Sequence, residues 1–138
     1  MSAAEIVIVC ALELLGRSAS SFPPIQILEH RPPEASATAV AFADSRGRVI
    51  YLIASAQPFS RARAAQVSGR ECREPELLKQ VAGTLVHEEW HVRNGADERG
   101  AYFAQLMALH LLGLGPGTPV YHEIKLAMRA AVAARAAR

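Results

Sequence analysis

The sequence predicts a single α+β domain over residues 1–138, with an N-terminal helix, a small antiparallel or mixed sheet that contains a hairpin, and a central helix followed by two further helices. Three observations predict this class. Apolar residues recur every three or four positions from about residue 74 to 112, two apolar runs flank a tight reversal at residues 44–47, and no internal repeat is present. A chain of 138 residues with 51% hydrophobic and 20% charged residues is long enough to bury a core as one domain.

The first half of the chain carries the predicted sheet and two helices. The apolar run at residues 3–16 is expected to be a buried helix, and residues 17–24, which include two prolines, connect it to the sheet. Three segments are expected to be strands, the last two paired as a hairpin: residues 25–29, 38–43 and 48–54. Residues 60–67 follow as a short helix that Ser68 and Gly69 close.

The second half of the chain is expected to be helical. Each helix has its own start signal, and the predicted spans are residues 74–93, 97–112 and 119–136. Pro75 suits a first helical turn, and Asn94-Gly95 supplies the stop of the same helix. Asp97 is expected to cap the next helix or to lie in its first turn, and Thr118 opens the last one.

Charge and targeting signals argue against several classes of function. The formal net charge is +2 and the arginines are scattered, so no nucleic-acid-binding stripe is expected. Glu5 and Glu13 lie in or beside the N-terminal apolar run, which fits neither a signal peptide nor a membrane span, so we expect a cytoplasmic protein without membrane contact. Cys10 and Cys72 are expected to be buried free thiols, although the sequence leaves a disulfide open. The oligomeric state is not indicated.

The most informative motif is H-E-x-x-H, formed by His87, Glu88 and His91 within the helix predicted over residues 74–93. Positions i and i+4 lie one above the other on a helix, so the two imidazoles can reach one cation. Glu88 lies about 100° further round the helix, where it could accept a proton from a water activated by the metal. The motif therefore predicts a metal site with a general base.

A catalytic zinc site needs a third protein ligand, because such sites usually hold three and leave one position open. If the chain reverses at Asn94-Gly95, Glu98 returns to the level of His91, so Glu98 is the expected third ligand. Tyr102 follows one turn later on the same face and could hydrogen-bond the Glu98 carboxylate or stabilise an oxyanion. Gln105 is a further candidate to orient a ligand.

This arrangement resembles a small zincin metallopeptidase of the gluzincin kind, in which a helix with H-E-x-x-H is followed by a helix that supplies a glutamate. The resemblance covers about residues 74–112. Glu98 followed by Ala101 and Tyr102 is similar to the E-x-x-A-D element of that family, with a tyrosine where the family often has an aspartate. Two further features depart from the pattern: Glu89 and Arg93 are charged, and the gap between the second histidine and the glutamate is short.

The resemblance implies a minimal zincin-like fold and a Zn²⁺ cofactor. It also implies that an edge strand above the active-site helix binds an extended peptide as an added strand. In such enzymes a tyrosine or histidine near the metal polarises the scissile carbonyl, which makes Tyr121 and His122 candidates beside Tyr102.

The sequence therefore predicts a zinc-dependent hydrolase, most simply a metallopeptidase with a peptide or protein substrate. His87, His91 and Glu98 would hold the metal, and Glu88 would be the general base. Two alternatives stay open. One is a zinc-bound interaction or regulatory module without turnover, which the charged Glu89 and Arg93 suggest, and the other is a metallohydrolase that acts on an ester or a small amide.

Overall fold

The structure is a computed structural model that describes residues 1–66 and 71–137. Within these residues the chain forms a small sheet, helices on both sides of a central helix, and one short 3-10 helix, which confirms the predicted α+β class. The elements in chain order are α1 (Ala3–Leu14), η1 (Ala19–Ser21), β1 (Ile25–Leu28), β2 (Ala41–Asp44), β3 (Val49–Ile53), α2 (Phe59–Ala65), α3 (Pro75–Asn94), α4 (Glu98–Leu111) and α5 (Pro119–Ala136).

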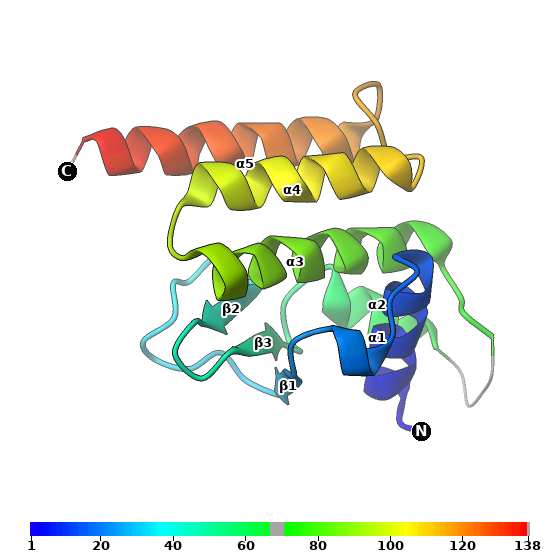
Figure 1. Ribbon diagram of the computed structural model, residues 1–138. Helices are drawn as coiled ribbons and strands as arrows, with labels where there is room; N and C mark the ends of the chain where they lie inside the picture. The colour runs from blue at the N-terminus through cyan, green and yellow to red at the C-terminus, as the bar shows by residue number, and fades with distance from the viewer. Residues whose placement is uncertain (67–70, 138) are drawn as a thin grey trace.

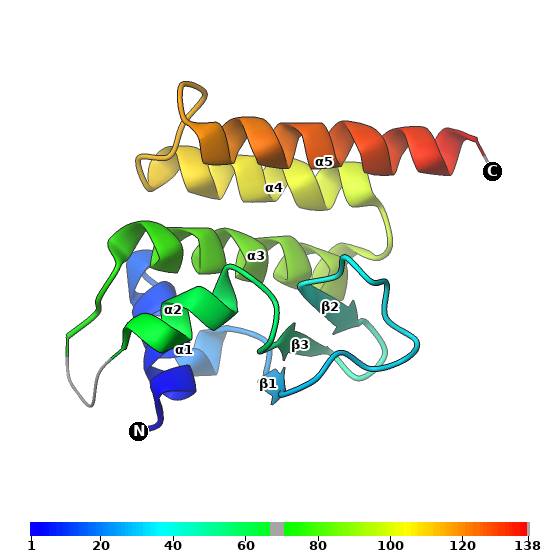
Figure 2. The same ribbon diagram turned by 180° about the vertical axis from the view of Figure 1, so that it is seen from behind.

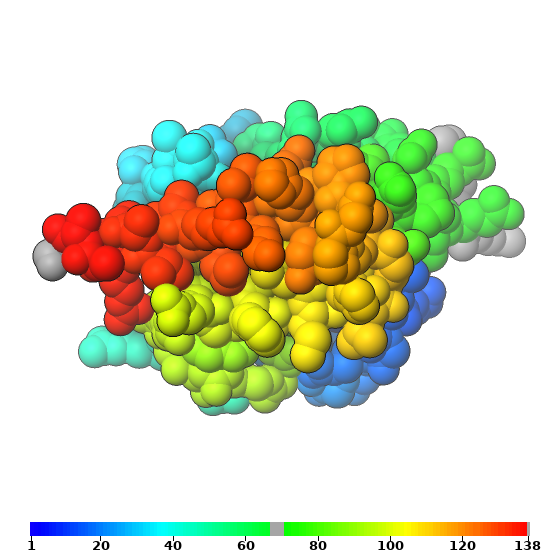
Figure 3. Space-filling view, turned by 90° about the horizontal axis from the view of Figure 1, so that it is seen from above, coloured from blue at the N-terminus to red at the C-terminus, as the bar shows by residue number. Residues whose placement is uncertain are grey.

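Helix α3 runs through the middle of the molecule (Figure 1). The sheet, α1 and α2 lie on one side of α3, and α4 and α5 lie on the other, as the view from behind also shows (Figure 2). From above, α4 and α5 cover this face side by side, and the C-terminal turns of α5 extend past the rest of the molecule (Figure 3). The helix that carries the H-E-x-x-H motif is therefore in contact with both halves of the fold.

The sheet has the strand order β1-β3-β2, with β1 parallel and β2 antiparallel to β3. The predicted hairpin is confirmed, and its register pairs Ala41 with Leu52 and Asp44 with Val49. Its first strand begins at Ala41, later than the predicted residue 38, because the preceding residues turn back so that the Ala39 N–H donates to the Ser36 carbonyl at 3.0 Å. As an outer strand of the sheet, β2 has one edge that β3 does not cover.

The core lies between the sheet, α1, α2 and one face of α3. Ile50 and Leu52 of the central strand are 0% and 1% exposed, which explains the continuous apolar run in β3. They belong to one buried cluster with the apolar faces of the helices, represented by Val7 of α1, Phe59 of α2 and Leu85 of α3. This packing fixes the position of α3 against the sheet, α1 and α2.

The helix ends follow the signals in the sequence. Ser2 and Glu5 form a capping box at the start of α1, where Oγ of Ser2 accepts from the Glu5 N–H at 3.2 Å. Pro75 occupies the first turn of α3, the Asp97 side chain caps α4, and Thr118 Oγ1 accepts from the Tyr121 N–H at the start of α5. The predicted closure of α2 by Ser68 and Gly69 lies outside the described residues.

The prediction for the cysteines is wrong. Cys10 of α1 and Cys72 form a disulfide with a Cα–Cα distance of 5.8 Å, so neither is a free thiol. The physical reason is that the chain before α3 passes beside α1, which brings together two residues that lie 62 positions apart. In the described part of the chain, no helix combines the length and the apolar character that crossing a membrane requires.

Candidate metal centre

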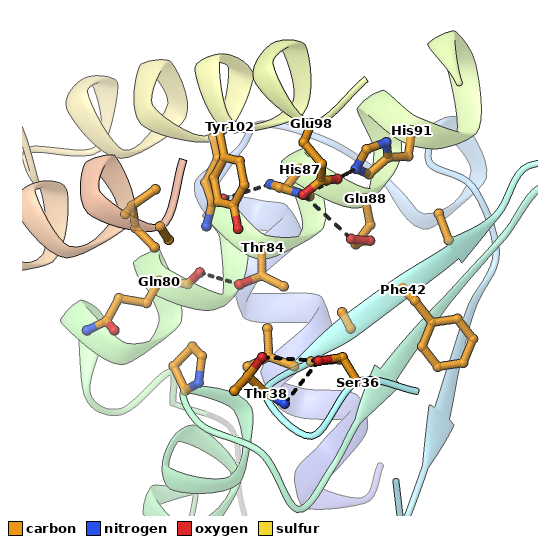
Figure 4. Close-up of a pocket in the computed structure, with 18 of the residues that line it drawn as sticks. Ser36, Thr38, Phe42, Gln80, Thr84, His87, Glu88, His91, Glu98 and Tyr102 are labelled. Carbon is orange, nitrogen blue, oxygen red and sulfur yellow. Dashed lines mark hydrogen bonds and ion pairs between the residues drawn. The ribbon is translucent and has the colours of Figure 1, made fainter. Parts of the chain in front are cut away.

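His87 and His91 lie on the face of α3 that looks toward α4. Their ring centroids are 5.0 Å apart with an angle of 66° between the planes, as expected for side chains one helical turn apart. Both residues are largely buried, since the exposed side-chain fractions are 11% and 14%. In Figure 4 the two rings point toward the same region of the cleft.

Glu98, in the first turn of α4, reaches both rings. Its Oε1 lies 3.6 Å from Nε2 of His87 and forms an ion pair with Nε2 of His91 (Figure 4). These interactions with His87 and His91 lower the pKa of Glu98 to about 2. The reversal at Gly95, whose φ of +97° favours glycine, turns the chain between the two helices.

The hydrogen bonds at the far side of each ring determine which nitrogen faces Glu98. Nδ1 of His91 lies 2.7 Å from the carbonyl oxygen of Gly95, and because a carbonyl only accepts, Nδ1 carries the hydrogen. Nδ1 of His87 lies 2.9 Å from Oε1 of Gln105 and, with that amide orientation, is also the donor. In the neutral rings both Nε2 atoms therefore have free lone pairs directed at one region.

A proton competes with a metal for this region. Burial acts to lower the pKa of His91, but hydrogen bonds with Glu98 and the Gly95 carbonyl and the negative charges of Glu88 and Glu98 outweigh it, so the pKa lies above its ordinary value. Relative to a free imidazole, the surroundings of His91 thus favour its protonated form, in which Nε2 pairs with Glu98. A divalent cation could take the place of that proton.

Glu88 lies at the same site and is buried, with 6% of the residue exposed. Its Oε1 is 3.9 Å from Nε2 of His87, and among the described residues no group hydrogen-bonds its buried Oε2. Burial raises the pKa of Glu88, partly offset by the charges of the two histidines. A buried carboxylate oxygen without a partner is unfavourable by itself and points to a ligand or water that completes the site.

The donors could hold a metal ion. One ligand atom each from His87, Glu88 and His91 lie within 4.8 Å of one another, and the Glu98 carboxylate reaches both rings. Two imidazoles and a carboxylate are a ligand set that catalytic zinc sites use. The convergence of the two Nε2 atoms on one region and the partnerless Oε2 of Glu88 are the observations that support this fit.

Tyr102 lies one turn along α4 from Glu98 and packs its ring edge-on against His87, with centroids 4.5 Å apart. One of the two roles expected for Tyr102 is a hydrogen bond to the Glu98 carboxylate. Within the described residues the Tyr102 hydroxyl makes no such bond, and the ring contacts His87 instead. Burial, together with the charges of Glu98 and Glu88, raises the pKa of Tyr102. Its hydroxyl therefore stays protonated and can donate into the cleft, where it points in Figure 4.

The structure does not bring His122 to the imidazoles. His122 is exposed near the start of α5 and does not line the cleft. The cleft is lined instead by other residues of this part of α5, such as Val120 and Glu123. Tyr121 is likewise absent from the cleft lining found for the described residues. Of the three candidates for polarising a carbonyl, Tyr102 is the one beside the histidines.

The charged residues Glu89, inside the motif, and Arg93, two residues after it, pair with each other and with Arg17 rather than with the histidines. Both oxygens of Glu89 accept from Arg17, at 3.1 and 2.7 Å, and Oε2 also accepts from Arg93. Burial acts to raise the pKa of Glu89, but the two arginines outweigh it and hold the pKa below its ordinary value. The departure of Glu89 and Arg93 from the family pattern is therefore explained by an ion-pair cluster that attaches the segment after α1 to α3.

A cleft of about 750 Å³ opens beside the histidines. Its floor is α3, one wall is the edge of β2 and the other wall is α5. Examples of the lining residues are Gln80 and Thr84 of α3, Ala41 and Phe42 of β2, and Glu123 and Ile124 of α5. The size is within the range of ligand-binding clefts.

Two contributions to this site have no signal in the sequence. The Gly95 carbonyl is a backbone group that any residue carries, and the roles of β2 and α5 as cleft walls depend on tertiary packing. In comparisons with protein-family models, with curated proteins and with solved structures, nothing matches this chain.

Proposed function

We propose that this protein is a zinc-dependent hydrolase with a minimal zincin-like fold, and that it cleaves peptide bonds. The observation that carries the proposal is the convergence of the two Nε2 atoms on the Glu98 carboxylate, with each Nδ1 already engaged by an acceptor. Such a set of lone pairs, arranged around one point, is suited to a metal.

In this proposal His87, His91 and Glu98 hold the metal. Zinc, when bound, supplies a Lewis acid that lowers the pKa of a water and polarises a carbonyl. Gln105 and the Gly95 carbonyl hold the imidazoles in the tautomer that presents Nε2, so the ligands need no reorientation when a metal binds. Glu98 carries the negative charge that partly balances the cation.

Glu88 would act as the proton carrier. Because its Oε2 is buried and has no described partner, a water that attacks the substrate carbonyl can hydrogen-bond there. Glu88 then accepts the proton as the water attacks and donates it to the leaving amide nitrogen. Its raised pKa brings it closer to the range in which a carboxylate both accepts and returns a proton. Tyr102 is placed to donate to the oxygen of the tetrahedral intermediate.

The free edge of β2 suits an extended peptide. The N–H of Ile53 donates to the carbonyl of Val40 at 3.1 Å, and alternation along an antiparallel pair then directs the backbone groups of Ala41 and Ala43 away from β3. Both residues line the cleft and have small side chains. A substrate strand could pair with them while its scissile bond lies at Glu88.

The direct test combines metal analysis with one conservative variant. Purified protein should contain about one zinc per chain and cleave an unstructured protein such as casein or a peptide library. Glu88→Gln should keep the metal and lose at least about 100-fold in turnover, since a general base contributes roughly 10²–10⁴. Glu76→Gln, an exposed glutamate in the first turn of the same helix, is the matched control. Normal cleavage by Glu88→Gln would disprove the assignment.

A second arrangement competes for the same residues. Because Glu88 lies within ligand distance of the histidines, it could be a fourth ligand of a closed zinc site without turnover. Glu88→Gln separates the two: as a ligand its loss weakens zinc binding, whereas as a base its loss leaves zinc binding intact. A protein that binds zinc but hydrolyses only esters or small amides would instead favour the non-peptidase alternative.

A further inference from the structure

The first turn of α4 holds a glycine that its backbone does not require. Gly100 lies two residues after Glu98 inside a regular helix, and the glycines with positive φ are elsewhere in the described chain. A glycine inside a helix costs about 1 kcal/mol relative to alanine. Its presence here therefore has to be explained by a neighbour.

The neighbour is the indole of Trp90. A Cβ placed on Gly100 would lie 2.5 Å from Cη2 and 2.7 Å from Cε2 of Trp90, and closer still to Cζ2. Real Cβ atoms do not approach other heavy atoms below 3.0 Å, so a side chain at residue 100 and the indole cannot both keep their positions. The backbone of α4 thus rests directly on the outer ring of Trp90.

Trp90 belongs to the same helical turn as the two histidines. Its ring centroid is 5.9 Å from that of His91, with an angle of 80° between the planes. The indole therefore extends from the histidine-bearing turn of α3 to the first turn of α4. It lies at the point where α4 comes close enough to α3 for the Glu98 carboxylate to reach the imidazoles of His87 and His91.

We infer that Trp90 and Gly100 are a positioning pair that sets the distance between Glu98 and the two histidines. The inference rests on the proposed metal site. A Cβ at residue 100 needs more than about 1 Å of extra space to reach an ordinary contact distance from the indole, whereas metal–ligand distances tolerate only about 0.2 Å. A shift of this size in the first turn of α4 moves Glu98 out of the ligand set even though the helix itself remains intact.

The test measures zinc affinity and stability separately. Gly100→Ala should raise the Kd for zinc, determined by competition with a chromophoric chelator, by about 10- to 100-fold, the usual effect of losing support for a ligand. The thermal midpoint of the metal-free protein should fall by less than the loss of zinc affinity would suggest, because alanine favours the helix. Gly117→Ala is the matched control, since nothing lies within 4 Å of a Cβ there and its φ is not positive. It should leave the Kd unchanged.

A compensating variant decides the case even if Gly100→Ala fails to fold. Phenylalanine lacks the outer indole ring, so Trp90→Phe combined with Gly100→Ala should fold and bind zinc within about tenfold of the wild type. The inference is overturned if Gly100→Ala binds zinc as tightly as the wild type. It is equally overturned if the double variant folds and binds zinc 100-fold more weakly than the wild type. Wild-type protein that binds no zinc would instead refute the proposed function.

Discussion

Oε1 of Glu98 lies 3.6 Å from Nε2 of His87, so a carboxylate at the start of α4 faces an imidazole from the preceding helix. The contact depends on the reversal at Gly95, which donates its N–H to the His91 carbonyl and accepts at its own carbonyl from the His91 ring. The same short turn therefore fixes the tautomer of one histidine and returns the carboxylate to both.

Removing the charge of Glu98 should weaken metal binding more than any change outside the ligand set. Glu98→Gln keeps the shape of the side chain but removes the carboxylate, so the Kd for zinc should rise by at least about 100-fold. That is the upper end of the loss seen when a residue that only supports a metal ligand is changed, and a ligand itself should matter at least as much. Asp97→Asn is the control, because asparagine caps a helix as well as aspartate does and Asp97 is exposed. Unchanged zinc affinity in Glu98→Gln would mean that another side chain supplies the third ligand.

The metal-free protein should lose stability as the pH rises through the raised pKa of His91. A folded-state pKa above the ordinary 6.5 means that the folded protein holds this proton more tightly than the unfolded chain. The stabilisation is complete below about pH 6.5 and disappears at higher pH. Glu98 has the opposite sign: with a pKa of about 2 it contributes above its ordinary 4.5 and the contribution is lost as the pH falls toward 2.

Chemical unfolding of metal-free protein between pH 5.5 and 8.5 measures the first of these effects. His91→Gln should flatten the dependence, because the group that gains the proton is gone. If zinc binds as proposed, it should reverse the trend, since the metal competes with the proton and would bind more tightly as the pH rises. Metal-free protein that becomes more stable from pH 6 to 8 would contradict the assignment of the raised pKa to His91.

Local signals predicted most of the fold and the centre of the candidate site. Capping and stop residues such as Thr118 and Gly95 act within one or two turns, so the helix boundaries could be read directly. The position of Glu98 followed from the length of the reversal. The disulfide and the indole contact with Gly100 could not be predicted, because each joins residues whose proximity depends on how whole elements pack.

The buried carboxylate of Glu89 should stabilise the fold without affecting the metal. In a double-mutant cycle with Arg17→Met and Glu89→Gln, each single change should lower the free energy of unfolding by about 2 kcal/mol, as expected for hydrogen bonds to charged groups. The coupling between the two changes should be favourable by more than about 0.5 kcal/mol. Zinc affinity should stay the same, because the Glu89 carboxylate is turned toward Arg17 and Arg93.

The exposed pair of Arg63 and Glu29, with side-chain exposures of 33% and 62%, is the internal control for that cycle. Glu29→Gln should cost less than about 1 kcal/mol. Equal effects at Glu29 and Glu89 would mean that burial does not strengthen the Arg17 pair. A loss of zinc binding in folded Glu89→Gln would instead give Glu89 a role in orienting the motif.

The link between Cys10 and Cys72 should be a large single contribution to stability. Closing a loop of 62 residues is worth about 4 kcal/mol in the chain-entropy model, so Cys10→Ala with Cys72→Ser should lower the free energy of unfolding in urea by about that amount. Thiol titration of unfolded protein without reductant should find no reactive cysteine. Disulfides persist mainly in oxidising compartments, so this pair weighs against the cytoplasmic location that the N-terminal sequence suggested. Two reactive thiols per unfolded chain would mean that the disulfide does not form. The argument against a cytoplasmic location would then fail, and the disulfide could not contribute to stability.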